Sequence, residues 1–582
     1  MAAHRKIIGR AVIALMLGTA LASCKPADTP TAATTTAAAA AASEPWAQFT
    51  QKTIDGWLAI DPAWAVYQGA HQYDGKLPDW SETGLKAKAD FLQAVIDHAR
   101  AYTQLTGDEK FEQGNMIKVA EGQLFWLKEA DQPHTNPAFY IGTLDPNTYI
   151  AREYADKPTR MKALIAYMNA IPAAAGQIRA NLRAPMPASF IKYGTAGFGG
   201  FADAYLSDAR AAFADVKDPA LQKQLTDSSQ LASKAMADLR DWLKGQEPNA
   251  TQDFALGADR FAHMLFATEA VDTRIADLEK IGQADLKRNQ DALKAECAKF
   301  APGKTIPLCM DKLNANKPVG GPVAEATRQI PMLTAFVKSK DIVTIPGTEK
   351  ALVHESPPYN RQNGAYIDPP GPFEKGIPSI YYISPPDPSW TKAKQDAYIA
   401  GVDDLMFTSV HEVMPGHFLQ FLHANRSPSL FGRLFVGYAY AEGWAHYSEE
   451  MMWEAGLGNG DPQVHIGQLS NALLRDCRFL SAIGMHARGM TMAQSKQMFI
   501  DQCYQDEGTA DQQAARGTYD PAYLNYTMGK LMIRKLRADW TATHGGRAGW
   551  KAFHDAFLNY GGPPIPLVRQ AMLNEARPAA TF

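Results

Sequence analysis

The chain has 582 residues, of which 46% are hydrophobic and 20% are charged, and its formal net charge is −3. These values are close to the globular average and exclude a disordered, collagen-like or polytopic membrane protein. No basic excess is available to neutralise phosphates, so nucleic-acid binding is not expected, and five cysteines are too few for a disulfide-based scaffold.

Residues 1–23 have the features of a secretory signal peptide. Basic residues are followed by an apolar run over residues 11–22, which is shorter than the roughly 20 residues needed to span a bilayer. The run ends in Leu-Ala-Ser-Cys, which looks like a bacterial lipobox that would make Cys24 the lipidated first residue; an ordinary signal peptide cleaved nearby is the alternative. Lys25 replaces the aspartate typical of inner-membrane retention, so we expect a lipid anchor in the outer membrane, facing the periplasm.

Residues 24–44 contain the expected lipidation site and a segment of almost only Ala, Thr and Pro. Such a composition cannot bury a core and indicates a flexible tether. Residues 45–582 are expected to form one large, mainly α-helical body with two possible lobes, 45–340 and 341–582. A small β element is expected beside a cleft between them.

Helical periodicity dominates the first lobe. The clearest helical patterns cover residues 160–182, 231–243, 257–300 and 323–340. Gly245 and Pro248 are expected to end the second of these helices. The glycine-rich stretch 194–200 lacks a following Lys-Ser/Thr pair, so it is interpreted as a tight turn between helices rather than a nucleotide-binding loop.

Residues 341–388 differ from their surroundings because Pro, Gly and Tyr are frequent there. The runs 342–345 and 377–384 favour β structure, so we expect a small sheet or hairpin with long loops. Its tyrosines include Tyr366, Tyr381 and Tyr382. We expect this segment to offer an edge strand on which an extended peptide can lie. Helices are expected again from about residue 389 to the end.

Four cysteines remain if Cys24 carries lipid. Cys297 and Cys309 are close in sequence and flank a Pro/Gly loop, so a local disulfide is expected in an oxidising periplasm. Cys477 could pair with Cys503. Four buried free thiols are the alternative, because the sequence does not fix the pairing. No Cys-x-x-Cys motif is present, so a cysteine zinc site is not expected.

The most informative motif contains His411, Glu412 and His417 on an expected helix. Zinc peptidases usually place two histidines four residues apart on one helix face, whereas six residues separate these two. On an ideal helix that spacing corresponds to about 600° of rotation and about 9 Å of rise, too far for one ion. Pro415 clashes with the His411 carbonyl, and Gly416 tolerates unusual φ values. We therefore expect these two residues to distort the helix and bring the histidines to one metal ion.

Glu412 directly follows the first histidine, so it is expected on a neighbouring face of the helix, beside the metal rather than bound to it. Its expected role is general base, taking a proton from the attacking water and passing it to the leaving amine. Apolar residues at 405–407, 418–419 and 421–422 indicate that the helix is buried, where unpartnered His and Glu side chains would be costly.

The third ligand is expected on the next helix. Glu442 follows His417 by 25 residues, which allows a second helix to pack against the first. Glu449 lies two turns further along the same face and is expected to orient a ligand histidine. His446 is the main rival to Glu442 as ligand. Two imidazoles, one carboxylate and an open position make a catalytic zinc arrangement with one Zn²⁺ per chain.

The string His-Glu-x-x-Pro-Gly-His-x-x-Gln, followed by Glu-Gly-Trp-Ala-x-Tyr-x-Glu, resembles the bacterial family called domain of unknown function 885. The resemblance covers essentially residues 45–575. Many members are lipoproteins or exported proteins and are regarded as gluzincin-like metallopeptidases, with a helical body similar to the oligopeptidase and angiotensin-converting-enzyme group. The resemblance implies His411, His417 and Glu442 as zinc ligands and Glu412 as general base.

The resemblance also implies donors for the oxyanion, because a Tyr and a His supply them in similar gluzincins. The candidates are Tyr526 first, His486 second and Tyr523 third, and core packing is the alternative for each tyrosine. This chain has Ala-Ile-Gly at 482–484 where the family usually has Asp-Thr-Gly, so a carboxylate that could orient His486 is missing. Arg516 could hold a substrate carboxylate or form a surface salt bridge.

These observations predict a lipid-anchored periplasmic zinc peptidase; the limitation to short peptides comes from the resemblance. One alternative is a zinc-dependent amidase or carboxypeptidase acting on a non-standard or γ-linked amide, such as a cell-wall fragment. Another is a non-catalytic lipoprotein that binds a peptide or an envelope partner, although a pure binding protein has no need of Glu412. The sequence does not indicate the natural substrate, the direction of cleavage or the oligomeric state.

Overall fold

The computed structural model describes residues 44–361, 363–577 and 581–582. The expected signal peptide, the lipidation site Cys24 and nearly all of the tether lie outside the described residues. Within the described ranges, no helix is both long enough and apolar enough to cross a bilayer.

The described body is mainly α-helical with one small sheet, which confirms the predicted fold class. Its N-terminal part contains α2 (Trp46–Ile60), α3 (Pro62–Tyr67), α4 (Glu82–Ala101), α5 (Gly107–Leu124), α6 (Gln132–Thr135), α7 (Ala138–Ile141), α8 (Asn147–Ala151), α9 (Lys157–Asn181), α10 (Ala188–Leu206), α11 (Asp208–Ala212) and α12 (Pro219–Lys244). After it come α13 (Ala258–Glu269), α14 (Ile275–Phe300), α15 (Ile306–Asn314), α16 (Pro322–Lys340), β1 (Ala351–Glu355), β2 (Ala365–Asp368) and β3 (Ser379–Ile383). The C-terminal part contains α17 (Lys392–Tyr398), α18 (Val402–Glu412), α19 (His417–Ala424), α20 (Leu430–Leu434), α21 (Tyr438–Glu454), α22 (Pro462–Ala487), α23 (Met492–Asp501), α24 (Glu507–Tyr519), α25 (Asn525–Thr541), α26 (Trp550–Leu558) and α27 (Ile565–Leu573).

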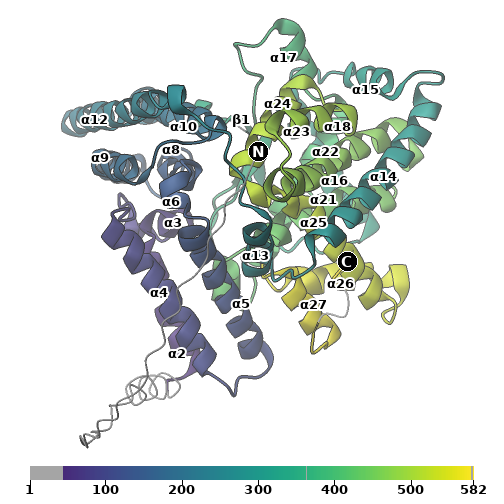
Figure 1. The fold of residues 1–582 in the computed structure, drawn as a ribbon, viewed down its shortest axis with the longest axis horizontal. Helices are drawn as coiled ribbons and strands as arrows, with labels where there is room; N and C mark the ends of the chain where they lie inside the picture. Colours follow the sequence, from purple (N-terminus) through teal and green to yellow (C-terminus); the bar gives the residue numbers. More distant parts are fainter. Residues whose placement is uncertain (1–43, 362, 578–580) are drawn as a thin grey trace, which may run out of the picture.

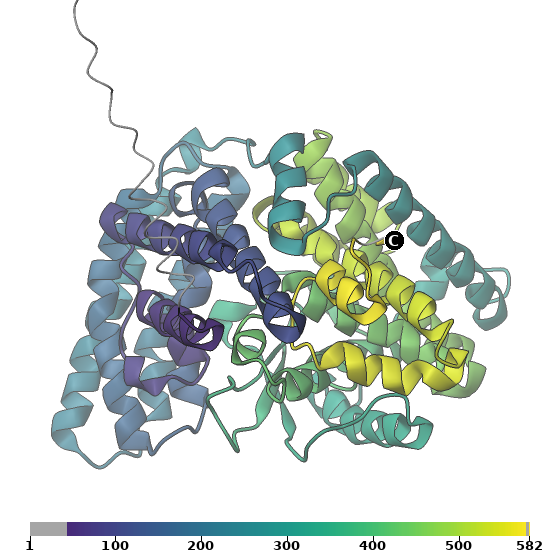
Figure 2. The ribbon, with the colours of Figure 1, turned by 90° about the horizontal axis from the view of Figure 1, so that it is seen from below.

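The hydrophobic interior consists of two clusters. One is built mainly from α2 to α12, and the other mainly from α13 onward, including the sheet. Figures 1 and 2 show the corresponding halves side by side, the first from purple to blue and the second from teal to yellow. Phe431 and Leu434 of α20 belong to the first cluster, so this short helix ties the C-terminal part to the N-terminal one. The division into lobes 45–340 and 341–582 stays a prediction.

Helical periodicity located several of the long helices that precede residue 341. The patterns over 160–182 and 323–340 correspond to α9 and α16, and α12 ends where Gly245 follows it, as predicted. The pattern over 257–300 is divided between two helices, α13 and α14. Their boundary includes Ala270, whose φ of 56° lies in the left-handed region and stops α13.

The glycine-rich stretch 194–200 lies inside α10, so the prediction of a turn is wrong. A Cβ at Gly194 would lie 2.4 Å from Leu243 Cδ2 of α12, and a Cβ at Gly200 would lie 2.8 Å from the Tyr359 Cα. These glycines therefore allow neighbouring elements to approach α10 closely, and they do not serve to turn the chain.

The predicted small sheet is present between residues 351 and 383. Strand β3 is central; it pairs in parallel with β1 and antiparallel with β2. The run 377–384 was correctly predicted, since it contains β3. The prediction of β structure for the run 342–345 is wrong, because backbone groups there form hydrogen bonds with side chains instead of a neighbouring strand. The Thr344 N–H donates to Asp555 Oδ1 at 2.8 Å, and the Thr344 carbonyl accepts from His423 Nε2 at 2.8 Å.

Both expected disulfides are formed. Cys297 of α14 is bonded to Cys309 of α15, and Cys477 of α22 is bonded to Cys503, just beyond α23. The first confirms the predicted local pairing, and the second settles the alternative of free thiols. Three of these four cysteines lie on helices of the half that contains the His-Glu motif.

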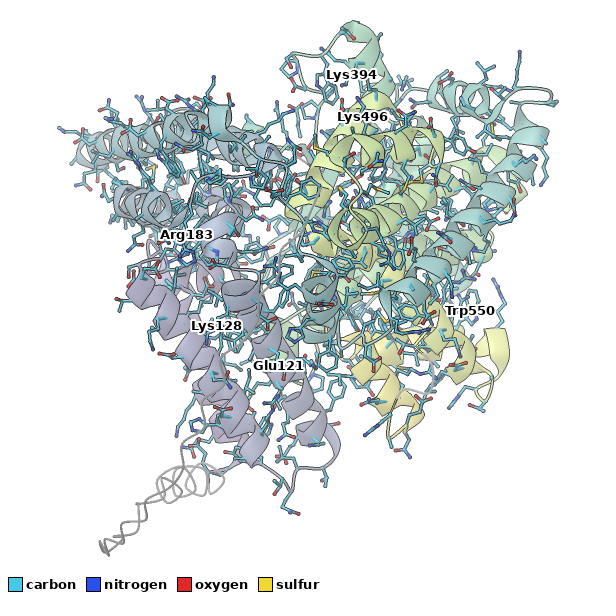
Figure 3. All side chains as sticks on the ribbon, in the orientation of Figure 1. Glu121, Lys128, Arg183, Lys394, Lys496 and Trp550 are labelled. Carbon is cyan, nitrogen blue, oxygen red and sulfur yellow. A yellow bond between two sulfur atoms is a disulfide. The ribbon has the colours of Figure 1, made fainter. Side chains whose placement is uncertain are left out.

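Two lysines contact helix α24, which carries the predicted site residue Arg516. Lys394 of α17 donates to Asp511 Oδ2 of α24 at 2.8 Å, and Lys496 Nζ of α23 lies 2.7 Å from Asp511 Oδ1. Figure 3 labels both lysines, near one another at the top of the molecule. Helix α24 is thereby held between two neighbouring helices.

Candidate metal centre

The His-Glu motif lies on two helices and not on one distorted helix. Helix α18 ends at Glu412, and α19 begins at His417. Gly416 has a φ of −73°, so it does not supply an unusual φ as expected. A Cβ at this position would lie 1.8 Å from the His411 carbonyl oxygen, a separation that only glycine permits. The break lets the chain return on itself between the two histidines.

The break brings the two histidines and Glu442 together, as predicted. His411 Nε2 and His417 Nε2 each lie 3.2 Å from Glu442 Oε2. The two imidazole rings are perpendicular, with centroids 4.8 Å apart. Among the described residues, this is the group of His, Cys, Asp and Glu side chains whose ligand atoms converge closely enough to hold a metal ion.

The donor set fits a zinc ion. Ligands bound at about 2.0–2.1 Å in a tetrahedron lie about 3.3–3.4 Å apart, close to the 3.2 Å that separates each histidine nitrogen from Glu442 Oε2. Two imidazoles and one carboxylate leave a coordination position for water or substrate, as in catalytic rather than structural zinc sites. The residues could therefore hold a metal ion.

Glu449 orients the first histidine. His411 Nδ1 donates to Glu449 Oε1 at 2.7 Å, which turns Nε2 toward Glu442. Arg475 Nη2 lies 3.2 Å from the same Glu449 oxygen. Burial opposes ionisation of this carboxyl, but Arg475 and His446 hold the pKa of Glu449 well below its usual range. The carboxylate is therefore a strong acceptor for the ligand histidine.

His446, the rival ligand, lies apart from the triad. Its Nδ1 is 3.2 Å from Glu449 Oε2, and its side chain is fully buried. Burial, reinforced by the charge of Lys530, lowers the pKa of His446 to about 3. The structure brings Glu442 to the histidines, and His446 lies on the far side of Glu449.

Glu412 is buried beside the triad. Burial raises the pKa of its carboxyl, although His411 and His417 act in the opposite direction. Its Oε2 is buried and has no hydrogen-bond partner among the described residues, and the residue lines a cavity. An unpartnered carboxylate oxygen in this place can accept a proton from a bound molecule.

A close helix crossing places Tyr526 next to the triad. A Cβ at Gly443 of α21 would lie 2.5 Å from the Gly529 Cα of α25, and a Cβ at Gly529 would lie 2.1 Å from the Ala439 carbonyl oxygen. The two backbones therefore touch, and the Tyr526 ring stacks on the His411 ring with centroids 5.9 Å apart. Sequence reasoning missed this glycine pair, because it could be recognised only by knowing which helices cross.

Tyr526 and Arg516 reach the cavity. Arg516 Nη2 donates to the Tyr526 hydroxyl at 3.3 Å, and Arg516 Nε donates to Asp520 Oδ2 at 3.0 Å. Arg516 also donates to the Tyr438 hydroxyl at 2.7 Å. Its charge is thus largely matched by protein groups.

His486 and Tyr523 are not brought to the cavity. His486 Nε2 donates to the Gly517 carbonyl at 2.7 Å, and its Nδ1 accepts from the Leu256 N–H at 3.3 Å. Tyr523 lies in the short 3-10 helix Pro521–Leu524, and its hydroxyl donates to Ser481 Oγ at 2.8 Å. Both side chains are bound to groups of the protein interior, so we do not include them in the proposed chemistry.

The sheet offers an edge strand at the site. Tyr366 lies on the edge strand β2, and residues 365–367 line the cavity. Tyr381 and Tyr382 lie on the central strand β3, and the Tyr382 hydroxyl is within 3.1 Å of Asn147 Nδ2. Of the three tyrosines, only Tyr366 belongs to an edge.

The cavity has a volume of about 700 Å³, within the range of small-ligand sites. Its wall includes His411, Glu412, His417, Glu442, Tyr526, Arg475, Arg478 and Arg516. Arg475 and Arg478 lie in a segment that resembles the family, but no role was predicted for either, since neither belongs to a ligand motif. The two arginines are three residues apart on α22, the spacing of one helix face, which was the available signal.

Comparison with known proteins agrees with this architecture. Residues 62–572 match the family described as bacterial protein of unknown function, DUF885. The chain is similar to the structure of a candidate lipoprotein of unknown function from Shewanella oneidensis (25% identity, TM-score 0.73, covering 91% of this chain and 100% of that one). It also resembles the structure of a candidate lipoprotein from Colwellia psychrerythraea (17% identity, TM-score 0.74, 90% and 99% coverage). Among curated proteins, no sequence matches the chain.

Proposed function

The chain belongs to the DUF885 family of bacterial proteins of unknown function, and we propose that it is a zinc-dependent peptidase that hydrolyses short peptides. One observation carries the proposal: His411, His417 and Glu442 converge on the wall of a cavity beside the buried carboxylate of Glu412. A binding site for metal alone would not need that carboxylate. One Zn²⁺ per chain is the expected cofactor.

His411, His417 and Glu442 would hold the zinc ion, with Glu449 orienting His411. When bound there, zinc would supply a Lewis acid that polarises a substrate carbonyl and acidifies water. Glu412 takes the proton from the attacking water and returns it to the leaving nitrogen, as a general base and then a general acid. Its orphan Oε2 supports this role.

Tyr526 stabilises the developing oxyanion. Its hydroxyl oxygen accepts from Arg516 at 3.3 Å, so its own proton is free to be donated into the cavity. Burial raises the pKa of Tyr526, so the phenol keeps that proton at neutral pH. Preorganised donors of this kind contribute typically about 3–4 kcal/mol to transition-state stabilisation.

The peptide substrate lies along β2. An edge strand has unpaired backbone groups, and residues 365–367 of this edge strand line the same cavity as the triad. Pairing there would hold an extended peptide with its backbone next to Glu412. The preference for short peptides over folded proteins is carried over from the family resemblance.

We further propose that the chain is anchored on the periplasmic side of the outer membrane through lipid on Cys24, after removal of residues 1–23, with residues 24–44 as a tether. The lipobox-like sequence, the two disulfides and the description of two structural relatives as candidate lipoproteins support this location. Cys24→Ala should abolish incorporation of a labelled fatty acid and release the chain from the membrane fraction. An unchanged distribution would refute the anchor.

The proposed activity is tested by metal content and by digestion of a peptide library read by mass spectrometry. Residues 25–582 should contain about one zinc per chain, and His417→Ala should lose it. Glu412→Gln should bind zinc normally and cleave nothing. If Glu412→Gln cleaves library peptides as fast as the unaltered chain, or if neither cleaves any, the peptidase proposal fails and a non-catalytic binding role is favoured. The chemical structures of the new product ends show whether the cleaved bond was an ordinary peptide bond or a γ-linked amide.

A further inference from the structure

Arg478 of α22 is a charged side chain on the cavity wall that the proposed reaction does not use. It is 7% exposed, and its Nε donates to the neutral Gln513 Oε1 at 2.7 Å. No carboxylate of the described residues pairs with it. The neighbouring arginines differ, since Arg475 is paired with Glu449 and Arg516 with Asp520.

A buried guanidinium without a counter-charge is unfavourable. Burial, together with the positive charges of Arg516 and Arg475, lowers the pKa of Arg478, but an arginine side chain still remains protonated. Buried charges are normally paired, because the desolvation of an unpaired ion costs several kcal/mol. An anion entering the cavity would provide the missing partner, and a guanidinium can bind a carboxylate through two parallel hydrogen bonds.

The position of Arg478 relates this anion site to the reaction. Its guanidinium carbon lies 4.4 Å from the centroid of the Tyr526 ring, and the same ring stacks on His411 at 5.9 Å. The Tyr526 ring therefore contacts both Arg478 and the proposed metal ligand His411. An extended peptide advances about 3.3–3.6 Å per residue, so a carboxylate held by Arg478 belongs within about one to three residues of the cleaved bond.

We propose that Arg478 binds the C-terminal carboxylate of the peptide substrate, so that the enzyme removes one to three residues from free C-termini. This rests on the proposed peptidase function and assigns its substrate class. An acidic side chain within a longer peptide carries the same group. We assign the chain terminus, which every linear peptide carries, and leave the acidic side chain as an outcome of the test.

The test compares one peptide as the free acid and as the C-terminal amide. Both are titrated into the zinc-loaded Glu412→Gln chain, which keeps the complex intact. The acid should bind about ten- to a hundredfold more tightly, as expected for charge-assisted hydrogen bonds. Adding Arg478→Gln should remove this ratio without weakening binding of the amide, and Arg478→Lys should retain part of it.

Arg488→Gln is the matched control. Arg488 follows the last turn of the same helix and pairs with Glu279 at 3.3 Å on the exposed surface, so the acid-to-amide ratio should not change. In the catalytically intact chain, digestion should release one to three C-terminal residues from the acid and spare the amide.

Three results would overturn the inference. Equal affinity for acid and amide with Arg478 present would show that no carboxylate is recognised. A preference that follows an internal Glu, whatever the chemistry of the terminus, would assign Arg478 to side-chain recognition. Equal weakening of acid and amide by Arg478→Gln would show a purely structural role. If acid is preferred in binding but the intact chain hydrolyses nothing, the peptidase proposal fails while the carboxylate site stands.

Discussion

Gly416→Ala tests whether close backbone contact, rather than helix periodicity, brings the two histidines together. The added Cβ would meet the His411 carbonyl oxygen at 1.8 Å, whereas Cβ contacts essentially never fall below 3.0 Å. The backbone must therefore open by about 1.2 Å between the two ligand-bearing helices. A zinc site tolerates changes of about 0.2 Å in its ligand distances.

We expect Gly416→Ala to lower zinc affinity at least about a hundredfold, since a displaced ligand no longer completes the coordination shell. Overpacking of this kind costs typically about 1–3 kcal/mol of unfolding free energy. Competition with a chromogenic chelator measures the affinity, and the absorption spectrum of the cobalt-substituted chain reports ligand geometry. Urea unfolding measures the stability.

Gly176→Ala provides the control. A Cβ at Gly176, inside α9, would meet nothing within 4 Å, so alanine there should gain up to about 1 kcal/mol of helix stability and leave zinc binding unchanged. Gly416→Ala with unaltered zinc affinity and cobalt spectrum would refute the reasoning, because the break would then tolerate a side chain.

Further predictions concern the groups around the triad. Glu449→Gln should lower zinc affinity about ten- to a hundredfold with the fold retained, because His411 loses its charged acceptor; unchanged affinity in the chelator assay would argue that Nδ1 needs no carboxylate. Gly443→Ala should force α21 away from Gly529, lower the unfolding free energy by about 1–3 kcal/mol and reduce peptide turnover, since Tyr526 moves relative to Glu442; normal stability and turnover would contradict the contact. Burial raises the pKa of Glu269 to about 8, above its usual value near 4.3. The contribution of the protonated carboxyl to the unfolding free energy is therefore fully present below about pH 4 and is lost as the pH rises toward 8. Glu269→Gln should therefore flatten the fall in unfolding free energy between pH 5 and 8, a fall of at most about 5 kcal/mol, and an equally steep profile in the variant would exclude Glu269 as its source.

The parts of the fold that local sequence determines were predictable. Helix α9 and the end of α12 follow from the spacing of apolar residues and from a terminating glycine. The glycines of α10 misled the prediction, because the same residue type permits turns and close helix packing. Which of the two applies depends on α12 and Tyr359, which are distant in sequence.

The residues of the candidate site that belong to short sequence motifs were predictable. His411, His417 and Glu442 converge as expected, and Glu449 contacts His411 as expected. The structure does not bring His486 to the cavity. Its ring nitrogens instead form hydrogen bonds with backbone groups of α24 and of the segment before α13. Such long-range backbone partners carry no sequence signal.

The six-residue spacing determines how this site must be supported. On a single helix, two histidines one turn apart are aligned by the helix itself. Here the alignment depends on contacts made by non-ligand residues: Gly416 against the His411 carbonyl, and Trp444 Nε1, which donates to the Pro415 carbonyl at 2.8 Å. The second contact joins the break to the helix that carries Glu442. All three ligand-bearing helices are therefore fixed to one another by groups that would not touch the metal, and the geometry of the triad is a property of the fold.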